Sequence, residues 1–90
     1  MSKVTPITLT IAGTDVRFVP NMTAHNGYIN ELTPHDKVGP SKRYLDRVVH
    51  QDDKAALKGL LDTHPGLAFQ LAQAVVEQYA PTVEIEVKNS

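Results

Sequence analysis

The four histidines are the side chains best suited to metal binding or acid–base chemistry in this sequence. They are His25, His35, His50 and His64, at spacings of 10, 15 and 14 residues. Two histidines on one helix bind the same metal when they are four residues apart, because both rings then face one side. These spacings predict no metal site, and we expect four separate histidines at the surface or the edge of the core.

The adjacent carboxylates Asp52 and Asp53 could in principle hold a cation or share acid–base work. Neighbouring side chains on a helix point about 100° apart, so the two do not converge on one point. We expect them instead at the start of a helix, accepting hydrogen bonds from free backbone N–H groups. Glu84 and Glu86 are two residues apart, and we expect them to keep one strand face in water.

Nucleophiles and phosphate loops are equally unsupported. The chain has no cysteine, and its serines lack the Gly-x-Ser-x-Gly context of a nucleophile elbow. The stretch Gly39-Pro40-Ser41-Lys42 lacks the spaced glycines of a phosphate loop, and Pro40 removes a backbone donor. The sequence therefore predicts no enzyme, no catalytic residue, no metal and no cofactor.

Length and charge restrict the remaining classes. Ninety residues predict a single domain over 1–90, with roughly 64% of the extended chain's surface buried on folding. Nine Lys and Arg against ten Asp and Glu give a net charge of -1, which favours neither a nucleic acid nor an anionic membrane as partner. No apolar block resembles a signal peptide or a membrane span, so we expect no membrane partner.

One basic stretch keeps a nucleic-acid-binding regulator as an alternative. Between residues 41 and 60 five cations outnumber three aspartates, and two short helices there could imitate a helix-turn-helix motif. The cations are Lys42, Arg43, Arg47, Lys54 and Lys58. Because acids interleave with them, a solvated helix face is the favoured interpretation.

The N-terminal third predicts a hairpin followed by a helix. Residues 7–11 alternate apolar and polar, 12–15 are turn-forming, and 16–19 resume the alternation. Pro20 ends the second strand and Asn21 suits the cap of a helix over 22–33. A second hairpin around Asn26-Gly27 is the alternative, but its flanks do not alternate cleanly, so we keep the helix.

The rest of the chain predicts a loop, three helices and a strand. Residues 33–40 contain two prolines and a glycine and should form a loop, after which Ser41 should cap a helix ending near residue 50. Another helix should cover 52–62, and 67–79 shows the strongest helical periodicity. Residues 82–88 alternate again and should form a strand.

These elements predict an α+β domain of order ββααααβ. A two-stranded hairpin is marginally stable alone. We therefore expect the C-terminal strand to join it in a three-stranded antiparallel sheet, packed against about four short helices with 67–79 at the centre.

Several stretches resemble a family of small phage tail assembly chaperones. They are residues 1–11, Phe18-Val19-Pro20-Asn21, Tyr28-Ile29-Asn30-Glu31, Ala55-Ala56-Leu57-Lys58 and Val75-Val76-Glu77-Gln78-Tyr79-Ala80-Pro81. The resemblance implies a non-enzymatic protein of the host bacterial cytoplasm, absent from the mature virion. It also implies that the chain keeps a tape-measure protein soluble and helps to recruit tail tube protein. A structural tail subunit is a further alternative, and homo-oligomerisation is left open.

A chaperone for a helical client needs a modest apolar groove that binds amphipathic helices reversibly. The helices at 41–50 and 52–62 carry six apolar residues that so small a core need not hide, and we take these as the candidate partner-binding residues. They are Tyr44, Val48, Val49, Leu57, Leu60 and Leu61. The alternative is that all six are buried.

Overall fold

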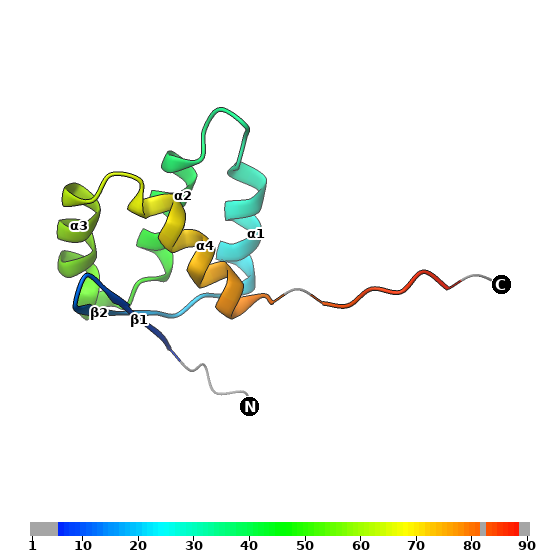
Figure 1. Cartoon of the computed structure of the whole chain (residues 1–90), viewed down its shortest axis with the longest axis horizontal. Helices are drawn as coiled ribbons and strands as arrows, with labels where there is room; N and C mark the ends of the chain where they lie inside the picture. Colours follow the sequence, from blue (N-terminus) through cyan, green and yellow to red (C-terminus); the bar gives the residue numbers. More distant parts are fainter. Residues whose placement is uncertain (1–5, 82, 89–90) are drawn as a thin grey trace.

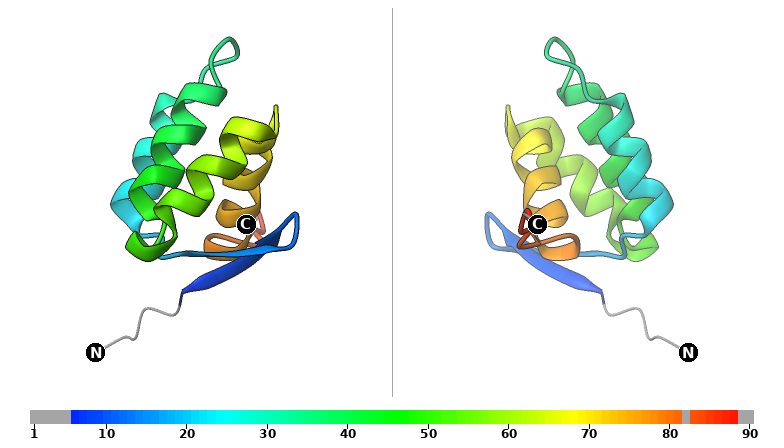
Figure 2. Two further views of the ribbon diagram at one scale, coloured as in Figure 1. Left: turned by 90° about the vertical axis from the view of Figure 1, so that its left-hand side faces the viewer. Right: turned by 90° about the vertical axis from the view of Figure 1, so that its right-hand side faces the viewer.

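The computed structural model describes residues 6–81 and 83–88, and its ribbon shows a hairpin, a group of helices and a C-terminal tail (Figure 1). The elements are β1 (Ile7–Ile11), β2 (Thr14–Phe18), α1 (Met22–Glu31), α2 (Val38–Val48), the short 3₁₀ helix η1 (Gln51–Asp53), α3 (Lys54–Thr63) and α4 (Leu67–Tyr79). Figure 2 shows the four α-helices gathered on one side of the hairpin. Within the described residues no helix is both long and apolar enough to cross a membrane.

The hairpin confirms the strands predicted at the N-terminus. β1 and β2 pair antiparallel with Ile7 opposite Phe18 and Ile11 opposite Thr14. The turn is only Ala12 and Gly13, both with positive φ, 48° and 83°. Such a turn matches the right-handed twist of the strands, and glycine adopts it without a steric penalty.

The outer edge of β2 is covered by the segment that follows α2. The Val19 amide donates to the Val48 carbonyl at 2.6 Å, and the His50 amide donates to the Arg17 carbonyl at 2.8 Å. Phe18 and Val49 form an isolated antiparallel bridge between these donations. A short extended stretch in the middle of the chain thus occupies the position beside β2 that a third strand could have taken.

The predicted three-stranded sheet is wrong. The sheet has two strands, and residues 83–88 are exposed and unpaired among the described residues, so the order is ββαααα without a final strand. In Figure 1 this tail leaves the end of α4 and runs away from the hairpin. Alternation assigns side chains to two faces but does not specify a neighbour, and the β2 edge is already covered. Thr82, the first residue of the predicted strand, lies outside the described residues.

The start predicted for the first helix is confirmed, whereas the start predicted for the second helix is wrong. The Asn21 cap is confirmed, because its side-chain oxygen accepts from the Ala24 amide at 2.8 Å. The Ser41 cap is wrong: α2 begins at Val38, within the predicted loop. A proline is tolerated in the first turn of a helix, so Pro40 does not delay the start. The Asp36 carboxylate accepts a hydrogen bond from the Gly39 amide at 3.3 Å, and this bond stabilises the first turn of α2.

Helix α4 covers the predicted range, and its inward face is a large part of the core. Ala68, Leu71, Ala72 and Val75 are buried on it. The other buried apolar residues come from β2, α1, α2, the residue after α2, and α3: Val16, Phe18, Ala24, Tyr28, Tyr44, Leu45, Val48, Val49 and Leu57. α2 packs between α1 and α4, whereas α3 touches α4 and β2 more lightly.

Candidate partner-binding groove

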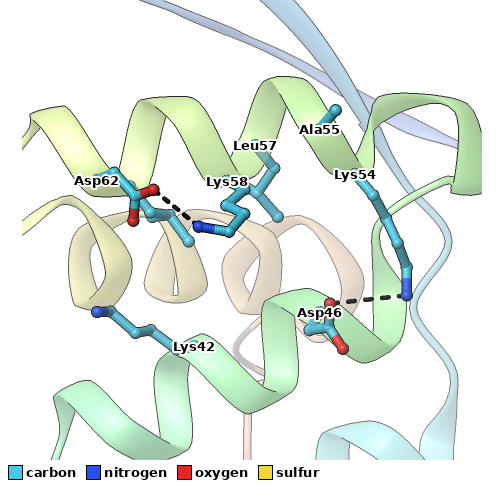
Figure 3. Close-up of a pocket in the computed structure, with 8 residues that line it drawn as sticks. Lys42, Asp46, Lys54, Ala55, Leu57, Lys58 and Asp62 are labelled. Atoms are coloured by element: carbon cyan, nitrogen blue, oxygen red, sulfur yellow. Dashed lines mark hydrogen bonds and ion pairs between the residues drawn. The ribbon is translucent and has the colours of Figure 1, made fainter.

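A groove of about 450 Å³ separates α2 from α3. Its apolar part comes from α3: Leu57 is 4% exposed and forms the floor, Leu61 is half-buried, and Ala55 is exposed at one side. Figure 3 shows the charged side chains of both helices around this apolar centre. An apolar floor inside a charged rim suits the apolar stripe of another amphipathic helix.

The rim is held by two exposed ion pairs and a further lysine. Lys54 lies 3.6 Å from the Asp46 carboxylate, and Lys58 lies 2.9 Å from the Asp62 carboxylate, as the dashed lines in Figure 3 mark. Exposed pairs of this kind contribute about 0 to 1 kcal/mol each, so a partner can displace them at little cost. Lys42 lines the same rim from α2, without an ion pair to any described residue.

The structure places the six candidate binding residues in three different positions. Tyr44, Val48 and Val49 are buried, with less than a tenth of each residue exposed. Leu57 and Leu61 line the groove, whereas Leu60 is half-buried against the core outside it. Four of the six are therefore buried, because Leu57 is only 4% exposed, and two of the six, Leu57 and Leu61, line the groove.

The charged rim was missed as part of a site, although the sequence contains its signal. Lys42 and Asp46 are four residues apart on α2. Lys54, Lys58 and Asp62 follow the same spacing on α3, as do Leu57 and Leu61. Residues four apart on a helix share a face, so charged and apolar rows side by side mark the two walls of a groove.

The basic stretch at 41–60 is largely neutralised by neighbouring carboxylates. Glu31 on α1 accepts from Arg43 at 2.9 Å and Arg47 at 3.3 Å, and these contacts lower the pKa of Glu31, the bond from Arg43 most. Lys54 pairs with Asp46 across the groove, and Lys58 pairs with Asp62 along α3. Four of the five cations therefore already lie beside an acid, which argues against a surface built for phosphates.

The histidines take separate local roles. The His25 ring packs against Tyr79 with ring centroids 5.7 Å apart. His50 accepts from the Asp52 amide at 3.1 Å, and His64 is within 2.9 Å of the Leu60 carbonyl. In the part of the chain that the structure describes, no three His, Asp or Glu side chains gather as metal ligands.

Asp53 anchors the hairpin to η1 instead of capping a helix. It occupies the N-cap position of α3 but makes no capping bond, so that expectation is wrong. Its carboxylate accepts from the Arg17 backbone amide at 2.8 Å and from the Arg17 guanidinium at 2.9 and 3.1 Å. These bonds lower the pKa of Asp53 to about 2, the side-chain bond most. Asp53 therefore gives the outward-facing Arg17 amide of β2 a hydrogen-bond partner. The same contacts hold the start of α3, the helix that forms one wall of the groove.

We predict that Asp53→Asn lowers the melting temperature at pH 7 and that the difference from wild type vanishes in acid. A depressed pKa stabilises the fold above the unfolded value of 3.8 and loses this effect as pH falls through about 2. Thermal melts followed by circular dichroism between pH 7 and pH 2 measure the difference.

The control for this prediction is Asp52→Asn. The Asp52 side chain is 74% exposed and lies 4.0 Å from the Arg17 guanidinium, so the substitution should leave the melting curve nearly unchanged. Equal effects of the two substitutions at pH 7 contradict a specific role of Asp53.

The structure is that of a small α+β domain in which a two-stranded hairpin packs with four helices, and α2 and α3 border a groove with an apolar floor. Residues 7–89 match the phage tail assembly chaperone family, and the chain belongs to this family. The sequence is also 37% identical over 83 residues to an uncharacterized 11.3 kDa protein in the lys 3′ region of Haemophilus phage HP1 (strain HP1c1). That match covers 92% of this chain and 80% of the relative. No solved structure matches.

Proposed function

We propose that this tail assembly chaperone binds an amphipathic helix of a phage tape-measure protein in the groove between α2 and α3. The observation that carries the proposal is the apolar floor of Leu57 and Leu61 within a rim of exposed charges. A tape-measure helix exposes an apolar stripe until the tail tube encloses it. Covering that stripe keeps the client soluble, and the action needs no covalent chemistry.

The dimensions of the groove limit what part of the client it holds. α3 has ten residues and is therefore about 15 Å long. A client helix lying along it presents two or three turns, with anchors spaced three and four residues apart. Because the α2–α3 groove is partly open to solvent, we expect reversible binding, which a chaperone needs in order to release its client to the tube.

The charges select the flanks of the client helix. Lys42 leaves a positive position on the α2 side, whereas the other rim lysines already face aspartates. A client with a carboxylate beside its apolar stripe gains an ion pair at Lys42, which speeds association at low salt. The preferred client segment is thus amphipathic and acidic along one flank.

The test substitutes two neighbouring alanines of α3. Ala55 and Ala56 are both exposed, but only Ala55 lines the groove. We predict that Ala55→Glu weakens binding to the tape-measure protein at least about tenfold, because it puts a charge against the client's apolar stripe. Co-expression followed by co-purification and titration with a client helix measures the loss.

The control is Ala56→Glu, which makes the same change on the same helix and should alter affinity less than about twofold. Equal losses from both variants exclude the groove as the binding site. If wild-type protein neither solubilises nor co-purifies with the tape-measure protein, the proposed client is wrong.

The proposal places the protein in the cytoplasm of the infected host, outside the finished particle, with tail tube protein as a second partner. Mass spectrometry of purified virions distinguishes this role from that of a structural tail subunit. A structural subunit is found in the virion at a fixed copy number, whereas the chaperone is absent.

A further inference from the structure

The C-terminal tail, residues 83–88, exposes more apolar surface than a solvated segment normally does. Val83, Ile85 and Val87 are 73%, 85% and 83% exposed and stand two residues apart. In an extended chain they share one face, while Glu84 and Glu86 share the other. A six-residue segment with this pattern has the composition of a strand but lacks a neighbour among the described residues.

The outer edge of β1 is a strand edge whose backbone groups have no hydrogen-bond partner among the residues that the structure describes. In an antiparallel pair, the residues that do not bond each other direct their N–H and C=O groups outward. Arg17 uses its own outward groups on His50 and Asp53, so Thr8, its partner in the hairpin, directs its groups to the opposite, outer edge of β1. Thr10 follows by alternation. β1 carries no charged residue, proline or bulge, the devices that normally protect an edge.

A hollow of about 410 Å³ lies between β1 and α4. Its lining is mostly apolar, with Leu9 and Ile11 from β1 and Leu67, Leu71 and Ala74 from α4, and it also includes the polar residues Thr10, His64 and Gln70. A strand added to β1 would direct every second side chain toward the hollow. Three apolar side chains in alternation, as in the tail, suit such a position.

We propose that the tail of one copy adds as a strand to the β1 edge of a second copy, with its apolar face over the hollow beside α4. The tail of each copy leaves α4 pointing away from its own hairpin, as Figure 1 shows, so it is presented to another molecule. Reciprocal exchange forms two such contacts and closes a two-fold symmetric dimer. This surface is separate from the α2–α3 groove and does not depend on the proposed client.

The charges favour pairing of a tail with the β1 edge over pairing of two tails with each other. Two tails paired with each other bring the carboxylates of Glu84 and Glu86 onto the same face, and like charges opposite each other destabilise a strand pair. On β1 the corresponding face carries Thr8 and Thr10, which are neutral. Glutamate beside threonine carries no such repulsion.

The first experiment measures mass in solution by light scattering on the full chain. We expect the wild type at twice the chain mass of 9.9 kDa. Ile85→Asp should raise the dimer dissociation constant about thirtyfold or more, the effect of losing an interface hot spot. Glu84→Gln, on the opposite face of the tail, should leave the dimer intact. Because these residues are exposed, neither change alters the folded body.

The second experiment locates the contact. Isotope-labelled Ile85→Asp protein has an intact β1 edge and accepts the tail of unlabelled wild type. We expect the backbone amide signals of Thr8 and Thr10 to shift on mixing. Adding Thr8→Pro to the labelled protein removes one outward N–H of β1 without removing a hairpin hydrogen bond. The wild-type tail should then no longer bind the labelled protein.

Three results overturn the proposal: a monomeric wild type, a dimer unaffected by Ile85→Asp, or shifts on mixing that avoid β1. A monomer whose tail is nevertheless required for client binding shows that the tail serves the client. In that case the groove proposal is still tested separately by the two alanine variants.

Discussion

Replacing Phe18 by alanine should lower the free energy of unfolding by about 3 to 5 kcal/mol, the usual cost of deleting a buried aromatic ring. Phe18 is fully buried in the cluster formed by the hairpin and the helices. Its backbone also forms the bridge to Val49 that covers the β2 edge. A domain of this length has about 5 to 13 kcal/mol in total, so the loss is a large fraction of the stability and brings the variant close to unfolding if the wild type lies at the low end of this range.

Two further variants give this result its meaning. Phe18→Leu keeps most of the apolar volume and should cost less than about 1.5 kcal/mol. Met22→Ala removes a large side chain that is 63% exposed and should change stability by less than about 0.5 kcal/mol. Urea unfolding followed by circular dichroism measures all three. A loss from Phe18→Ala as small as that from Met22→Ala would mean that the hairpin does not pack on the helices.

Local signals in the sequence sufficed for elements whose ends are set by neighbouring residues. The Asn21 side chain and the alternation of residues 7–11 determine the first helix start and the first strand. In 67–79 the apolar residues recur over the whole length of α4, so one buried face determines it. Each of these depends on contacts within a few positions of the chain.

The errors arose where a distant residue competes for the same group. Asp53 could accept from its own helix or from Arg17, 36 positions earlier, and the bidentate bond to a guanidinium is the stronger choice. Ser41 could cap a helix, but it lies buried against the Tyr28 hydroxyl within α2. No local pattern shows which partner is chosen.

Only part of the groove's lining could be predicted, because the burial of a residue also depends on partners far away in the sequence. The helices predicted at 41–50 and 52–62 correspond to α2 and α3, which border the groove, and Leu57 and Leu61 among the six candidate residues line it. The burial of Tyr44, Val48 and Val49 depends on how α2 packs between α1 and α4, which helical periodicity alone does not determine. A stripe of apolar residues indicates which face of a helix is covered. It does not indicate whether that face is covered by the rest of the same protein or by a binding partner.

Two tyrosines stacked in the core provide a matched test of that packing. The rings of Tyr28 and Tyr44 lie 4.8 Å apart, and both residues are fully buried. The Tyr28 hydroxyl lies 3.0 Å from the Ser41 hydroxyl and accepts from the Gln73 amide at 3.1 Å. The Tyr44 hydroxyl has no hydrogen-bond partner among the described residues, and burial raises the pKa of Tyr44 to about 12.

Replacing each tyrosine by phenylalanine should therefore change stability in opposite directions. Tyr28→Phe should cost about 1 to 2 kcal/mol, because it breaks two bonds and leaves the Ser41 and Gln73 groups with fewer partners. Tyr44→Phe should stabilise by about 1 kcal/mol or more, because it removes a buried hydroxyl that gained nothing for its lost hydration. Urea unfolding at pH 7 separates the two by about 2 to 3 kcal/mol. If both variants are destabilised equally, the Tyr44 hydroxyl has a partner, and α2 packs against α4 differently from the arrangement described.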